Sequence, residues 1–68
     1  MTPDDIRARI VVIRAWAIDH EEYDKAHQAE SDLWRDVLAA IAGGVDQPAE
    51  LAKAALESRY VDFPRGFG

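Results

Sequence analysis

The alternation of apolar and polar positions predicts helices over most of the chain. Near its start, apolar side chains recur every three or four residues and share one stripe at 100° per residue, as expected for a helix that faces a core. This stripe consists of Ile6, Ile10, Ile13 and Ala17. Thr2 is a suitable N-cap and Pro3 suits the first helical position, so the pattern predicts a helix over about 3–17.

Two further helices are predicted downstream. Asp19 precedes two glutamates, which is typical of an N-cap with acids in the first turn, and paired glycines at 43 and 44 stop a helix. These signals predict a second helix over about 20–42, with a continuous helix through Asp19 as the alternative. Pro48 begins a third helix over about 48–59. We therefore expect one all-α domain of three helices over residues 1–68.

An aromatic segment follows the third predicted helix. It carries Tyr60, Phe63 and Phe67, ends in glycine and shows no helical or strand periodicity. We expect an extended tail that docks on the helices, because a core of this size gains much from an aromatic cover; the alternative is a tail that awaits a partner.

The first helix is apolar on more than one side. Val12 and Trp16 form a second stripe, four residues apart, away from the isoleucine stripe. A short chain offers few elements to cover both stripes, so we expect Val12 and Trp16 to form a partner surface, most simply in a homodimer. The alternative is that the third helix and the tail cover them.

One acidic residue interrupts the apolar face of the second helix. That face consists of Tyr23, Ala26, Leu33, Trp34, Val37, Leu38 and Ile41, and Glu30 projects into its middle. A carboxylate among apolar side chains is costly unless it is paired, so Glu30 requires a cationic or hydrogen-bonding partner. His27, Arg14 and an arginine of the tail are the candidates. We interpret this position as a buried polar clasp that fixes how the helices align.

Candidate chemistry is sparse. His20, Asp24 and His27 follow the spacing i, i+4 and i+7, which places three metal-ligand types along one helix edge and makes a divalent-metal site the alternative function. Both serines lie in helical segments without a nucleophile elbow, and the glycine pair lacks the lysine of a phosphate loop. We therefore expect no enzymatic activity and no cofactor.

The composition of the chain restricts the classes of partner that it is expected to bind. The chain has 68 residues, no cysteine and a net charge of −5, so disulfides are impossible and direct nucleic-acid binding is not expected. Its longest apolar run is too short to span a bilayer, which favours a cytoplasmic location over a membrane. Seven acids against two bases give residues 19–36 a charge of −5. The acidic edge of Glu21, Glu22 and Asp24 could meet a basic partner, or imitate DNA toward a transcription-associated protein.

Several motifs resemble small uncharacterised proteins of actinobacteria and their phages. The chain carries the pattern Ala-His-x-x-Glu-x-Asp-Leu over residues 26–33, the pattern Pro-x-x-Leu-Ala-x-x-Ala-Leu over 48–56, and Asp-Phe-x-Arg at the tail over 62–65. The resemblance covers about two thirds of the chain and carries no activity that can be transferred. It implies a phage-type accessory protein that binds a host protein in the host cytoplasm and interferes with host growth.

The recognisable positions of this resemblance include His27, Glu30, Asp62 and Arg65. They suggest that the polar clasp joins the second helix to the tail. From the sequence, then, we expect a non-enzymatic, self-associating interaction protein with contacts at Val12, Trp16 and the acidic edge.

Overall fold

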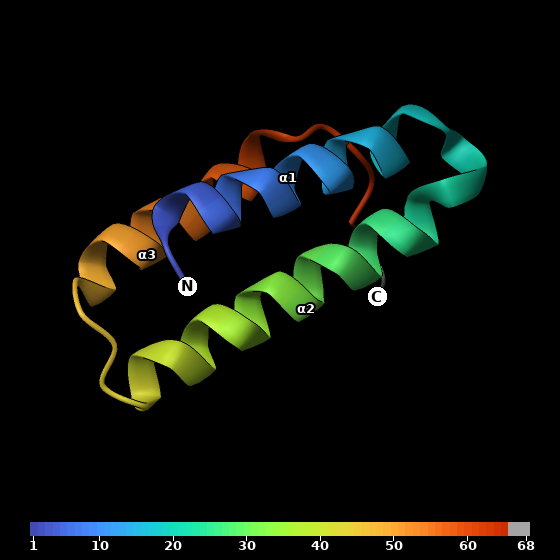
Figure 1. Ribbon diagram of the computed structural model, residues 1–68. Helices are drawn as coiled ribbons and strands as arrows, with labels where there is room; N and C mark the ends of the chain where they lie inside the picture. Colours follow the sequence, from blue (N-terminus) through green and yellow to red (C-terminus); the bar gives the residue numbers. More distant parts are fainter. Residues whose placement is uncertain (66–68) are drawn as a thin grey trace.

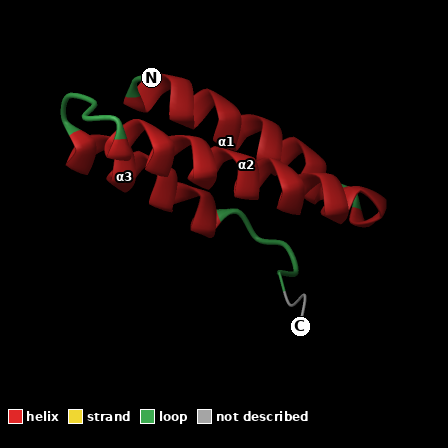
Figure 2. Ribbon diagram, turned by 90° about the horizontal axis from the view of Figure 1, so that it is seen from below, coloured by secondary structure: helices red, strands yellow, loops and turns green. Residues whose placement is uncertain are grey.

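The computed structural model describes residues 1–65 and shows three helices (Figure 1). Helix α1 spans Pro3–Ile18, α2 spans Tyr23–Ala42 and α3 spans Pro48–Leu56, with short 3₁₀ helices η1 at His20–Glu22 and η2 at Glu57–Tyr60. Within the described residues there is no strand, so the predicted all-α domain of three helices is confirmed. Helices α1 and α2 run antiparallel, and α3 returns beside α1 (Figures 1 and 2).

The start of α1 is fixed by a capping box. The Thr2 hydroxyl accepts from the Asp5 backbone N–H at 3.2 Å, and the Asp5 carboxylate accepts from the Thr2 N–H at 2.9 Å. These two bonds satisfy backbone donors that the first helical turn leaves unpaired. The helix then begins at Pro3, as predicted.

The turn between α1 and α2 is built on Asp19. Its backbone is extended, at φ −102° and ψ 115°, so the alternative of a continuous helix is wrong. Its Oδ1 accepts from the Glu21 N–H at 3.0 Å, which makes Asp19 the cap of η1. The second α-helix starts at Tyr23 rather than His20, because the first three residues after the cap form the tighter 3₁₀ turn.

The second turn uses left-handed backbone at two positions. Gly44 has φ +85° after the end of α2, and Gln47 has φ 56° and ψ 53° immediately before Pro48. Helix α3 is shorter than the predicted 48–59, because its last turn tightens into η2.

The core contains the predicted isoleucine stripe. All four of its residues are buried, together with the inward side chains of α2 and α3. The tail adds Val61 and Phe63, which are also buried, and the Phe63 ring centroid lies 6.4 Å from that of Tyr23. The tail up to residue 65 thus docks on the helices as expected, although Tyr60 is exposed; Phe67 lies outside the described residues.

Gln47 provides a test of this geometry. A non-glycine residue in the left-handed region is strained by its Cβ, so Gln47→Gly should raise the free energy of unfolding by about 0.5–1 kcal/mol. Gln47→Ala is the control, because it keeps the Cβ, and it should bring no such gain. Urea unfolding of the three proteins measures the difference, and equal stability of the two variants would contradict strain at this position.

Candidate functional site

A buried ion pair joins α2 to the tail. Glu30 is only 6% exposed, and its carboxylate accepts two hydrogen bonds from the Arg65 guanidinium, Nε to Oε1 at 2.8 Å and Nη2 to Oε2 at 3.0 Å. Arg65 also donates to the backbone carbonyls of Ser58 and Val61 at 3.0 and 2.9 Å, and its guanidinium carbon lies 4.0 Å from the centroid of the Phe63 ring. The structure thus pairs Glu30 with a tail arginine, which was one of the three candidates.

The pair extends into a polar network. Ser58 is fully buried on η2, and its hydroxyl accepts a 2.9 Å hydrogen bond from the indole N–H of Trp34. The Ser58 side chain is also a hydrogen-bond partner of the Glu30 carboxylate. Buried polar groups are costly unless satisfied, and here Trp34, Ser58, Glu30 and Arg65 satisfy one another.

The charge on Glu30 is stabilised despite its burial. Burial alone raises the pKa of Glu30, but the hydrogen bonds from Arg65 and Ser58 outweigh that cost, with further help from the charges of Arg65 and His27. The net effect holds the pKa of this carboxyl below its ordinary value. Glu30 is therefore an ionised partner of Arg65 at neutral pH.

The other two predicted members of the clasp behave differently. His27 is half-buried on α2 and lies near enough to Glu30 to favour its ionised form. Asp62 is exposed, and its carboxylate forms no hydrogen bond or ion pair with any residue from 1 to 65. The structure therefore does not bring Asp62 into the clasp, because the tail turns its neighbours Val61 and Phe63 inward instead.

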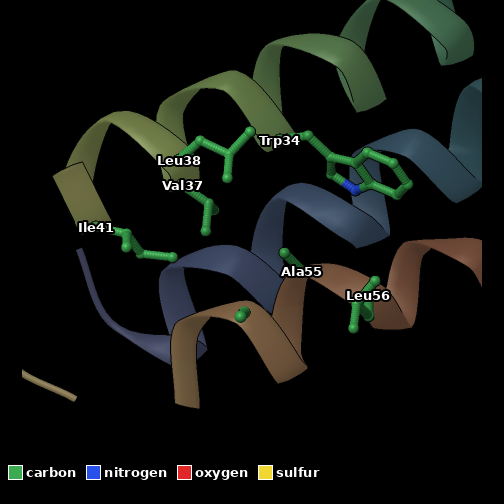
Figure 3. Close-up of a pocket in the computed structure, with 7 residues that line it drawn as sticks. Trp34, Val37, Leu38, Ile41, Ala55 and Leu56 are labelled. Atoms are coloured by element: carbon green, nitrogen blue, oxygen red, sulfur yellow. The ribbon is translucent and has the colours of Figure 1, made fainter. Parts of the chain in front are cut away.

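An apolar groove lies between α2 and α3 (Figure 3). The α2 side consists of Trp34, Val37, Leu38 and Ile41, and the α3 side of Ala52, Ala55 and Leu56. Val37 and Ala55 are buried at its base, whereas Leu38 and Leu56 are 66% and 57% exposed. The groove encloses about 190 Å³, which is small for a metabolite pocket and suits the side chains of a protein partner.

The groove was not predicted from the sequence. Leu38 and Ile41 were expected in the core, but the facing residues of α3 include Ala52 and Ala55, which are too short to cover them. The available signal was the alanine content of the third helix. Trp34 connects the groove to the clasp, because its ring lines the groove while its N–H is held by Ser58.

The two residues of the expected partner surface, Val12 and Trp16, differ in exposure. Val12 is exposed, but Trp16 is half-buried and packs against the core, with the Lys25 ammonium 4.8 Å from the ring centroid. Trp16 is thus less exposed than expected, and a partner surface at Val12 and Trp16 stays a prediction. The lysine over the ring comes from α2, and the core cluster beneath it includes residues of α3 and of the tail.

The acidic segment is largely paired within the chain. Glu22 forms an ion pair with Lys25 at 2.9 Å, whereas Glu21 and Asp24 remain exposed. Further ion pairs in this segment join Glu30 to Arg65, Asp32 to Arg35 and Asp36 to Arg9. These pairs reduce the negative surface that a DNA mimic needs.

The predicted metal ligands do not assemble. His20 belongs to η1, whereas Asp24 and His27 belong to α2, so the three residues do not follow one helical register. Among residues 1–65, no three histidine, aspartate or glutamate side chains come close enough to hold a metal ion. The metal-binding alternative at His20, Asp24 and His27 is therefore wrong for the described chain.

Comparison with other proteins adds no further assignment. No protein-family model, curated protein or solved structure matches the chain. In the described part, no helix is long and apolar enough to cross a bilayer. The site is thus defined by its own geometry: an apolar groove whose tryptophan is fixed by a buried ion-pair network.

Removing Arg65 tests the clasp. Arg65→Ala leaves the Glu30 carboxylate buried without its cation and should lower the free energy of unfolding by about 2–3 kcal/mol. Glu30→Ala should cost a similar amount or less, because the Arg65 side chain is 32% exposed and reaches water. Exposed Arg59→Ala is the matched control and should be near neutral; thermal melts compare all three. A neutral Arg65→Ala variant would show that the pair has no structural role.

The same pair predicts a pH dependence. Because the folded-state pKa of Glu30 is lowered, the unfolded chain binds more protons between the two pKa values, and stability rises with pH there. The contribution of the pair is complete above the unfolded pKa, about 4.3, and is lost as pH falls through the folded pKa. Glu30→Gln should flatten this acid-side loss in urea titrations, whereas exposed Glu21→Gln should not. Parallel pH profiles of wild type and Glu30→Gln would refute the assignment.

Proposed function

We propose that this protein is a small non-enzymatic interaction protein that self-associates and binds another protein through the groove between α2 and α3. The observation that carries the proposal is the exposure of Leu38 and Leu56 on opposite walls of an apolar groove. Paired apolar walls of this kind take the hydrophobic face of a partner helix. The resemblance to phage-type accessory proteins supports a host protein as this partner, bound in the host cytoplasm to interfere with host growth.

The charges beside the groove specify the partner further. Leu56 has Lys53 three residues before it and Arg59 three residues after it, and such spacings place side chains on neighbouring positions of a helix surface. Arg59 is exposed and has no acidic partner among residues 1–65. Lys53 forms only a surface ion pair with Glu50, at 3.7 Å. Such a pair adds little stability, so Lys53 can pair with an acidic residue of a partner instead.

The α2 wall repeats this arrangement. Arg35 precedes Leu38 by three residues and is exposed, with Asp32 as its ion-pair partner. The groove of an acidic protein is thus bordered by cations on both walls. We infer that its occupant is an amphipathic helix whose apolar anchors are flanked by aspartate or glutamate.

A pair of designed peptides tests this function. Both carry leucines at i, i+4 and i+7 on a helical frame, flanked by glutamates in one and by lysines in the other. The glutamate peptide should bind more tightly by about tenfold at low salt, and less so at high salt, in fluorescence anisotropy titrations. Leu38→Glu should abolish this binding, because it places a charge on the apolar wall.

A control variant distinguishes binding in the groove from nonspecific hydrophobic binding. Ile18→Glu changes an equally apolar, 83% exposed side chain far along the chain from the groove and should leave peptide binding intact. Equal affinity for the two peptides, or unchanged affinity in Leu38→Glu, would contradict the proposal. A change of solution mass in Leu38→Glu would instead show that a second copy occupies the groove.

A further inference from the structure

The outward face of α1 is a second apolar surface. Ala8, Val11, Ala15 and Ile18 follow one another at spacings of three, four and three residues, which is the a/d pattern of a coiled-coil seam. All four are exposed, Val11 by 58% and Ile18 by 83%. At 100° per residue they lie opposite the buried isoleucine stripe, and Figure 2 shows α1 along one edge of the bundle.

The size of the four seam residues suits close packing against a second helix. Alanine at both a positions allows two helix axes to approach, while Val11 and Ile18 supply the apolar area at the d positions. Between Ala8 and Ile18 no charged residue falls within this face. Asp4 lies on the same face one turn earlier and forms an ion pair with Arg7 at 3.8 Å, so an identical face can cover residues 8–18 without burying an unpaired charge. A second copy of this chain is therefore an occupant of matching chemistry.

The charges along the seam are also complementary to a second copy. In this heptad register, Arg7 and Arg14 occupy g positions, and Asp19, the C-cap at which α1 ends, takes the place of the following e position. Arg7 is already held within the chain, where its Nε and Nη2 donate to Glu57 at 3.3 and 3.1 Å. Within residues 1–65, neither Arg14 nor Asp19 has an ion-pair partner; Asp19 only caps η1.

The positions of these two charges select an orientation. In a parallel pair of helices, a g residue faces the e residue five positions further along the partner, so Arg14 of each copy faces Asp19 of the other. In an antiparallel pair, g positions face g positions. This arrangement brings Arg14 toward Arg7 of the other copy, and the two positive charges repel each other. Charge complementarity thus favours the parallel arrangement.

We propose that a second copy of this chain docks on the outward face of α1, forming a parallel two-helix seam closed by two symmetric Arg14–Asp19 ion pairs. This inference rests on the self-association that is part of the proposed function, and it is independent of the α2–α3 groove. The apolar seam supplies the affinity, and the exposed ion pairs fix the orientation.

Solution mass over a dilution series tests the surface. Wild type should show a dimer that dissociates on dilution, measured by light scattering after size exclusion. Val11→Asp should raise the dimer dissociation constant by at least about tenfold while circular dichroism shows an unchanged helix content, since Val11 is exposed. Leu38→Asp, a matched change at the groove, should leave the dimer intact.

Charge exchange tests the orientation. Arg14→Asp should weaken the dimer by roughly three- to tenfold at low salt, and Asp19→Lys should do the same. An equimolar mixture of these two variants should recover dimer, because each interface position again pairs opposite charges. Arg59→Asp is the matched control without effect. A stronger dimer in Arg14→Asp would overturn the parallel seam, because only in an antiparallel pair does the introduced carboxylate face Arg7 of the other copy.

Cross-linking gives an independent answer, because the chain has no natural cysteine. Ala15→Cys lies at an a position, which faces itself across a parallel seam, and should form a disulfide-linked dimer under mild oxidation. Exposed Ala39→Cys on α2 should not. A monomer at every concentration would refute self-association itself. A dimer that survives Val11→Asp, together with an Ala15→Cys variant that does not cross-link, would refute this surface and leave self-association standing.

Discussion

The ion pair between Glu30 and Arg65 is the constraint on which the rest of this structure depends. A carboxylate 6% exposed in the middle of α2 must find a cation, and the one that reaches it lies 35 residues further along the chain. To deliver that guanidinium, the tail must cross the helices, and Val61 and Phe63 are buried on the way. A buried pair adds little net stability over apolar residues of the same shape, so its main effect is to specify one docking position for the tail.

The docked tail also fixes the position of a side chain at the surface. Arg65 binds the Ser58 and Val61 carbonyls, and the Ser58 hydroxyl holds the indole of Trp34, whose ring forms part of the apolar groove. Hydrogen bonds on the side away from the groove thus hold its tryptophan in place, whereas the side that faces the groove is apolar. Preorganisation of this kind lowers the entropic cost of binding, because the aromatic anchor is already ordered before a partner arrives.

The sequence predicted the parts that depend on local pattern. The isoleucine stripe and the existence of three helices follow from periodicity, and the burial of Glu30 follows from its apolar neighbours. The 3₁₀ turn before Tyr23 was missed because a capping aspartate can begin either kind of helix. The groove and the cover of Trp16 could not be predicted, because both depend on how far apart the helices pack and on where Lys25 extends.

The separation of Glu30 from Arg65 has a consequence for synthesis. The hairpin of α1 and α2 is synthesised before Arg65, so for that interval Glu30 has no access to its native cation. A carboxylate cannot be buried unpaired at neutral pH without a large penalty, and the nascent hairpin must therefore keep that part of α2 open to water. Arg65 thus completes the fold, and the final packing of α2 waits until the tail has been synthesised.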